Sequence, residues 1–156
     1  MIVIFQCFGG THTSVAAAAI YLGKLPRSRV PRLEELLALP YFDRVDKAEI
    51  GTLNYAGRDR QGHLVFILGS GCRGTEVRGL LSSFVKLAGA RKPVVAVIDC
   101  FPEVIFPVRL GGFISRRLGL TSIGRPLVGR GILRSYPRLV ALVNSFEKDP
   151  TPYILN

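Results

Sequence analysis

Cys7, His12 and Ser14 are the residues of this chain whose types and spacing best suit phosphate chemistry. They lie in the stretch CFGGTHTS (residues 7–14), which follows a short apolar run and precedes an alanine-rich stretch. This order predicts a buried strand, a glycine-containing turn and the start of a helix. The first amides of a helix have no partner within it and carry partial positive charge, so they attract anions. We therefore expect a phosphate-bearing ligand at this junction.

Each residue type in the turn has a role in this hypothesis. Glycines let the backbone wrap a phosphate, and hydroxyl side chains cap the helix or bond to the ligand. A thiol that faces helix amides is a candidate nucleophile, although a small apolar residue at the end of a strand is the alternative role for Cys7. His12 either contacts the ligand or makes a local hydrogen bond. The candidate catalytic residues are Cys7, His12 and Asp99, and the candidate phosphate-binding residues are Gly9, Gly10, Thr11, His12, Thr13, Ser14 and Arg73.

The turn resembles the nucleotide-binding P-loop, in which glycines surround the phosphates and a Lys-Ser/Thr pair contacts phosphate and magnesium. His12 stands where that lysine would be, and the loop is shorter. The apolar run that ends at Asp99 is similar to the second nucleotide motif, a strand that ends in a metal-holding aspartate. Mg²⁺ is therefore expected if the ligand is a nucleotide.

Two loops that carry a reactive cysteine are also similar. The phosphocysteine loop of the sugar-phosphotransferase IIB proteins has the spacing Cys-x-x-Gly-x-x-Thr-Ser, which Cys7, Gly10, Thr13 and Ser14 match. The loop of the low-molecular-weight tyrosine phosphatases, Cys-x5-Arg-Ser, aligns at Cys7 and Ser14. Thr13 replaces its phosphate-binding arginine, so ordinary phosphatase activity is not expected.

A second glycine-rich turn, residues 69–74, also follows an apolar strand and precedes a helix. From this turn, Arg73 could reach a phosphate held by the first turn; a flexible connection with Thr75 as the helix cap is the alternative. Cys72 and Cys100 also fall at predicted strand ends, but no Cys-x-x-Cys spacing exists, so we expect no metal site.

Composition sets the class of protein. The chain has 156 residues, of which 48% are hydrophobic, and its formal net charge is +10. We expect a single domain over residues 1–156 with an acidic partner, for which a phosphate-containing small molecule fits best. The arginines are dispersed, so nucleic acid is the weaker alternative. Polar residues and prolines interrupt every long apolar run, and no basic leader precedes the first one, so we expect a cytoplasmic protein without a membrane span or signal peptide.

The periodicity predicts an α/β fold with three layers: a mostly parallel sheet with helices on both faces and one β-hairpin. One helix, residues 75–88, should bury Val77, Leu80, Leu81, Phe84, Val85 and Ala88. The run at 93–99 is apolar without alternation, as a central parallel strand should be. The expected strands are 1–6, 52–57, 64–68, 93–99 and 126–128, and the expected helices are 13–22, 33–39, 75–88, a kinked 103–118, and a last one from 136 or 137 to 146, followed by an extended tail at 149–153.

Three segments resemble an uncharacterised bacterial family, the domain of unknown function 3189. They are residues 7–14, 39–43 and 124–128, and the resemblance covers nearly the whole chain. It implies a small cytoplasmic protein and supplies no activity.

Two classes of function remain open. The first is a protein that binds a nucleotide or phosphometabolite, with or without phosphotransfer. The second is a non-catalytic regulatory or protein-interaction module of the same fold, which the missing lysine and arginine favour. The oligomeric state does not follow from the sequence.

Overall fold

The computed structural model describes residues 1–44, 49–89, 94–100 and 121–155, with only the backbone of residues 121–125. The kinked helix expected at residues 103–118 lies outside the described residues. The elements, in chain order, are β1 (Ile2–Cys7), α1 (Thr13–Tyr21), α2 (Leu33–Leu37), β2 (Leu53–Arg58), β3 (Leu64–Gly69), α3 (Gly74–Leu87), β4 (Val95–Asp99), α5 (Thr121–Lys148) and the short 3₁₀ helix η3 (Thr151–Tyr153).

The strands form a four-stranded sheet in the order β2-β3-β1-β4. β1 is parallel to both β3 and β4, and β2 is antiparallel to β3. The predicted α/β class with a mostly parallel sheet is therefore confirmed. Cys7 is paired in register with Gly69, and Gln6 with Asp99, so the three parallel strands end together at one edge. We call this the carboxyl edge and the opposite one the amino edge.

The sequence prediction of a central place for β4 is wrong. β3 and β1 are the interior strands of the described sheet, and β4 lies at its end. The apolar sequence of β4 reflects burial on both faces, since Val95 to Ile98 are all buried. The chain's last residues cover its outer side, where the Leu155 N–H donates to the Val95 carbonyl over 2.8 Å and Ile154 bridges to Ala96.

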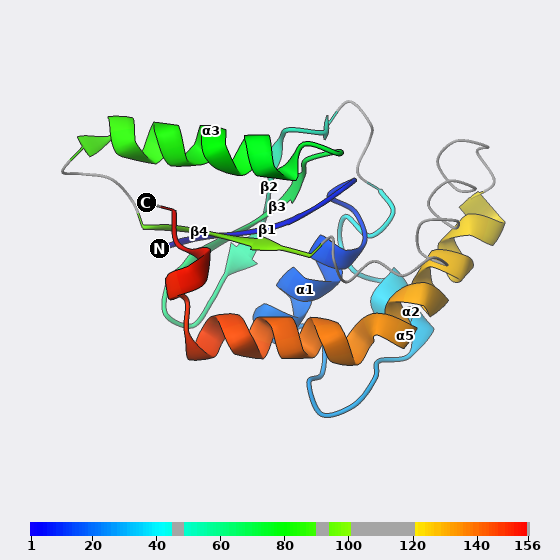
Figure 1. Cartoon of the computed structure of the whole chain (residues 1–156). Coiled ribbons are helices and arrows are strands. Elements are labelled where there is room, and N and C mark those ends of the chain that lie inside the picture. Colours follow the sequence, from blue (N-terminus) through cyan, green and yellow to red (C-terminus); the bar gives the residue numbers. More distant parts are fainter. Residues whose placement is uncertain (45–48, 90–93, 101–120, 156) are drawn as a thin grey trace.

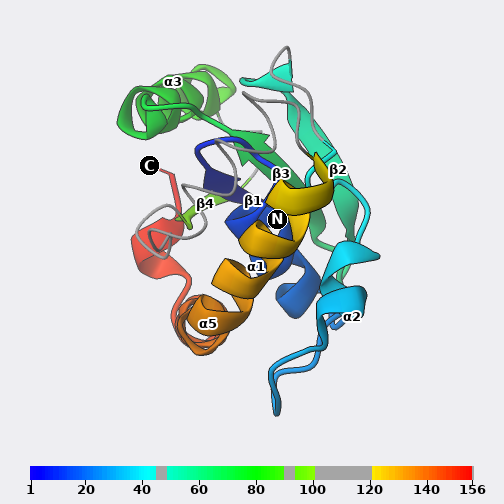
Figure 2. The same cartoon turned by 90° about the vertical axis from the view of Figure 1, so that its right-hand side faces the viewer.

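Helices cover both faces of the sheet: α3 lies over one face, and α1 and α5 lie over the other (Figure 1, Figure 2). α1 packs between the sheet and α5. Its small residues Ala16, Ala17 and Ala18 are fully buried, which allows both neighbours to approach closely. α1 ends one residue earlier than predicted, and Gly23 follows its C-cap with a positive φ of 70°.

The longest helix was not foreseen. The sequence predicts an edge strand at residues 126–128 and a helix that starts at Tyr136 or Pro137, but α5 runs unbroken through both Pro126 and Pro137. A stripe of buried side chains at helical spacing begins just after Pro126, continues past Pro137 and packs against α1 and the sheet. This packing outweighs the hydrogen bonds that the prolines remove. The stripe consists of Val128, Ile132, Tyr136, Leu139, Val143 and Phe146.

The prediction for the α3 surface is partly wrong. Val77, Leu81 and Val85 pack toward the sheet, as expected. Leu80 and Phe84 do not, because 58% and 62% of their surfaces are exposed. The buried stripe has strict four-residue spacing and is therefore narrower than the apolar face in the sequence.

The C-terminal segment also differs from the expected extended tail, since residues 151–153 form η3 before the chain straightens along β4. Among the described helices, none combines the length and apolar character that crossing a membrane requires.

Candidate functional site

The turn after β1 and the turn after β3 pack backbone against backbone at the carboxyl edge. Gly10 has a φ of +64°, and a Cβ placed there would come within 2.6 Å of the Gly69 nitrogen. A Cβ on Gly69 would in turn come within 2.9 Å of the Gly9 carbonyl carbon. Both contacts are too close for any side chain, so the glycines allow the two turns to touch.

Hydrogen bonds fix this arrangement. The Ser70 N–H donates to the Cys7 carbonyl over 2.9 Å, and the Gly71 N–H donates to the Phe8 carbonyl over 2.8 Å. The Ser70 hydroxyl also donates to the Cys7 carbonyl, over 3.3 Å. As a result, the starts of α1 and α3 share one edge of the sheet, as the sequence predicts for two strand–turn–helix junctions.

The start of α1 has the features of an anion site. Its first helical hydrogen bond runs from the Ala16 N–H to the His12 carbonyl, so the amides of Thr13, Ser14 and Val15 precede that bond. No acidic residue lies in its first turn. The Thr13 side chain is only 1% exposed, and its hydroxyl has no hydrogen-bond partner in the described part of the chain. A buried hydroxyl without a partner is uncommon and needs an explanation.

Cys7 is the last residue of β1 and is 4% exposed. Its sulfur lies 3.1 Å from the Ser14 hydroxyl, which is also buried. Cys7 and Ser14, which align with both cysteine loops, are therefore in direct contact at the start of α1. This contact places the sulfur beside a side chain of the first turn of α1.

Residues 41–43, which were not predicted as part of the site, also hold the turn. The His12 Nε2–H donates to the Asp43 carboxylate over 3.1 Å, and the Thr11 hydroxyl donates to the Tyr41 carbonyl over 2.9 Å. Tyr41 and Asp43 both have positive φ values, 66° and 54°, an unfavourable conformation for residues other than glycine. Between them, Phe42 is fully buried and its ring contacts the His12 ring. The residues at 39–43 that resembled the family thus lie against the turn.

Three further side chains lie at the carboxyl edge. Gln6 is buried beside Gly74, and its Oε1 has no partner among the described residues. Arg73 directly precedes α3 and is exposed, and no hydrogen bond or ion pair of its guanidinium involves a described residue. Asp99 is the exposed last residue of β4. No local signal distinguishes Gln6 in the sequence, because it occupies an ordinary position in an apolar strand.

The family described as Protein of unknown function (DUF3189) matches residues 2–148 of the chain. The chain belongs to this family. No curated protein and no solved structure matches it.

In this DUF3189 protein, the candidates of the opening turn converge on one place, and Arg73 and Asp99 lie at the same edge of the sheet. Of the three cysteines, Cys7 and Cys100 are buried and Cys72 is exposed. Within the described ranges, no group of three or more His, Cys, Asp or Glu side chains could hold a metal ion.

Proposed function

We propose that this protein binds a phosphate-bearing small molecule, either a nucleotide or a phosphometabolite, at the start of α1. The observation that carries the proposal is the buried Thr13 hydroxyl, which has no described partner and belongs to the first residue of a helix. A phosphate oxygen bound there would accept hydrogen bonds from this hydroxyl and from the amides of the first turn.

Charge supports the same assignment. Arg73 has no hydrogen-bond or ion-pair partner among the described residues and belongs to the turn that packs against Gly10, so its guanidinium can approach a phosphate at the same edge. The net charge of +10 also favours an anionic ligand. His12 is already paired with Asp43, so we assign to it the positioning of the turn as well as any contact with the ligand.

If the ligand is a nucleotide, Asp99 is the residue that would hold a magnesium ion. It ends the strand beside β1, where an acidic side chain can hold a magnesium ion on bound phosphates. This version predicts that Mg²⁺ strengthens binding and that Asp99→Asn removes the effect of magnesium.

The contact between Cys7 and Ser14 favours a second version, phosphotransfer through a phosphocysteine. It predicts a covalent phosphoenzyme that disappears in Cys7→Ala. The burial of Cys7 argues for the binding version, because a nucleophile must be reached by the group that it attacks. The non-catalytic alternative, a regulatory or interaction module, uses the same site without turnover.

The test is thermal unfolding in the presence of nucleotides, sugar phosphates and inorganic phosphate, with and without magnesium. A ligand that binds only the folded state raises the melting temperature. Thr13→Val keeps the shape of the side chain and removes the hydroxyl, so it should abolish the shift. The free protein should be as stable as before or slightly more stable, because a buried hydroxyl without a partner is unfavourable.

Thr151→Val is the matched control, since it makes the same change at the exposed first residue of η3. It should leave the ligand-induced shift intact. A shift that survives Thr13→Val would place the ligand elsewhere. A panel without any shift would favour the protein-interaction module.

A further inference from the structure

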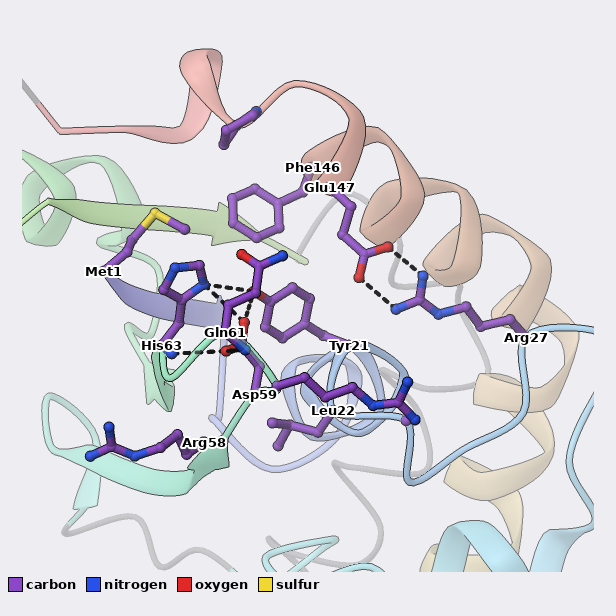
Figure 3. Close-up of a pocket in the computed structure, with 13 residues that line it drawn as sticks. Met1, Tyr21, Leu22, Arg27, Arg58, Asp59, Gln61, His63, Phe146 and Glu147 are labelled. Atoms are coloured by element: carbon purple, nitrogen blue, oxygen red, sulfur yellow. Dashed lines mark hydrogen bonds and ion pairs between the residues drawn. The ribbon is translucent and has the colours of Figure 1, made fainter.

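A cavity of about 640 Å³ lies at the amino edge, which is the edge of the sheet opposite the proposed phosphate site. It is lined from the start of β1, the end of α1, the β2–β3 connection and the end of α5 (Figure 3). Its volume is in the range of small-molecule sites. The phosphate-binding proposal makes no use of this cavity.

The polar wall of the cavity is held by Asp59. Its Oδ2 accepts hydrogen bonds from the Tyr21 hydroxyl over 2.6 Å and from His63 Nδ1 over 2.9 Å. Its Oδ1 accepts the N–H groups of Gln61 and His63, over 2.9 and 2.8 Å. These bonds join the β2–β3 connection to the end of α1, so the wall is fixed before any ligand arrives (Figure 3).

The same contacts set the charge of this wall. Burial, and then the hydrogen bond to Asp59, raise the pKa of Tyr21, so its hydroxyl stays protonated. Burial alone would raise the pKa of Asp59, but the hydrogen bonds from Tyr21, His63 and Gln61 outweigh it and lower the pKa. Asp59 is therefore a carboxylate whose acceptor sites are already in use.

His63 presents a free hydrogen-bonding atom. A carboxylate can only accept, so the Nδ1 that contacts Asp59 carries the hydrogen. In the neutral ring, Nε2 is then an acceptor, and it has no partner within the described ranges. It can accept a hydrogen bond from a hydroxyl or N–H group of a ligand.

Among the charged side chains that line the cavity, those without an oppositely charged partner in the described part of the chain are arginines. Arg27 is paired with Glu147, so these two charges neutralise each other. Arg58 donates a hydrogen bond to the Gly62 carbonyl over 3.1 Å, and its guanidinium is directed away from Tyr21 and His63 (Figure 3). Arg60 has no hydrogen bond or ion pair with any described residue, and it also lines the cavity.

The remaining wall is apolar. The side chains of Met1, Leu22 and Phe146 line the cavity together with the Tyr21 ring, which packs against the Phe146 ring at a centroid distance of 5.6 Å. We propose that this cavity binds a small organic anion with a ring-sized apolar body: its acidic group at Arg60, its body against the apolar wall, and a hydroxyl or N–H donor at His63.

The test is amide chemical-shift mapping of the ¹⁵N-labelled full chain, titrated separately with 4-hydroxybenzoate, indole-3-acetate and phenyl phosphate. At least one probe should shift the amides of Leu22, Gln61 and His63, and its neutral analogue should bind more weakly. Arg60→Gln should weaken that binding about tenfold, the effect of a charge-assisted hydrogen bond worth about 1.4 kcal/mol. Arg60 is exposed and has no hydrogen bond or ion pair with a described residue, so the variant should stay folded.

Arg134→Gln is the control, since Arg134 is an exposed arginine of α5 that does not line the cavity. Equal weakening by the two variants would show non-specific attraction to a basic protein and overturn the proposal. Absence of shifts at the cavity amides with all three probes would also overturn it. Thr13→Val should leave the shifts at these amides unchanged, which separates this site from the one at Thr13.

Discussion

Gly10→Ala is the most direct test of how the candidate site is built. Gly10 combines a positive φ of 64° with backbone contact, because a Cβ there would lie 2.6 Å from the Gly69 nitrogen and 3.0 Å from its Cα. The atoms in the way belong to backbone rather than to the end of a side chain, so they cannot rotate away. The added methyl group must therefore push the two turns apart.

Two terms contribute to the expected loss of stability. Placing a non-glycine residue in the left-handed region costs about 1–2 kcal/mol, and overpacking adds about 1–3 kcal/mol. The sum is a decrease of about 2–5 kcal/mol in the free energy of unfolding. Gly89→Ala isolates the first term, since Gly89 has nearly the same φ, +61°, and nothing within 4 Å of its Cβ position.

Urea unfolding of both variants, with extrapolation to water, gives the comparison. Gly89→Ala should lose about 1–2 kcal/mol, and Gly10→Ala at least about 1 kcal/mol more. Gly10→Ala should also lose the ligand-induced thermal shift, because it displaces the start of α1. Equal losses of stability in the two variants would refute the packing of the turns described above.

Three further changes test other parts of the structure. Asp59→Asn should lower the free energy of unfolding by about 1–3 kcal/mol at pH 7. Because folding lowers the pKa of Asp59, this difference should persist above about pH 4 and shrink as the pH falls further. The same difference in urea unfolding at pH 7 and at pH 3 would contradict this prediction. On α3, Phe84→Gln should change stability by less than about 0.5 kcal/mol, whereas Val85→Ala, at a buried position, should cost about 2 kcal/mol. A comparable loss in both variants would restore the face expected from the sequence. A Cβ on Gly129 would lie 2.4 Å from Leu33 Cδ1, so Gly129→Ala alone should destabilise the protein. In a Leu33→Ala background the same change should stabilise it by about 0.5–1 kcal/mol, because alanine is the better helix former. Additive effects in this double-mutant cycle would exclude the contact.

The part of the fold that could be predicted is the part set by local signals. The apolar β1, the glycines of the first turn and the alanines of α1 follow each other without ambiguity, and the structure places α1 at Thr13–Tyr21. The parallel strands then bring the two glycine-rich turns to one edge by geometry alone. The gathering of the turn residues with Arg73 and Asp99 at that edge follows from this order.

α5 shows where local signals fail. Pro126 and Pro137 each suggest a boundary, and Gly129 and Gly131 suggest a turn between them. In the structure, both glycines are buried inside the helix, and Gly129 lets α5 approach Leu33 of α2. The sequence does not distinguish a glycine that allows close helix packing from a glycine that forms a turn. In α5, the stripe of buried side chains distinguishes them.

The contacts around the first turn and around the amino-edge cavity could not be foreseen for a different reason. His12 meets Asp43, and Tyr21 meets Asp59, across 31 and 38 residues of chain. No periodicity links such pairs, because each depends on how a loop returns to α1.

Ligand sites of parallel sheets are expected at the carboxyl edge, and this expectation points to the start of α1 but not to its end. α1 contributes Thr13 to the proposed phosphate site and Tyr21 to the cavity wall, so a single buried helix of nine residues positions groups at both edges of the sheet. Probes that bind at the two edges should therefore be distinguishable by the end of α1 whose amides they shift.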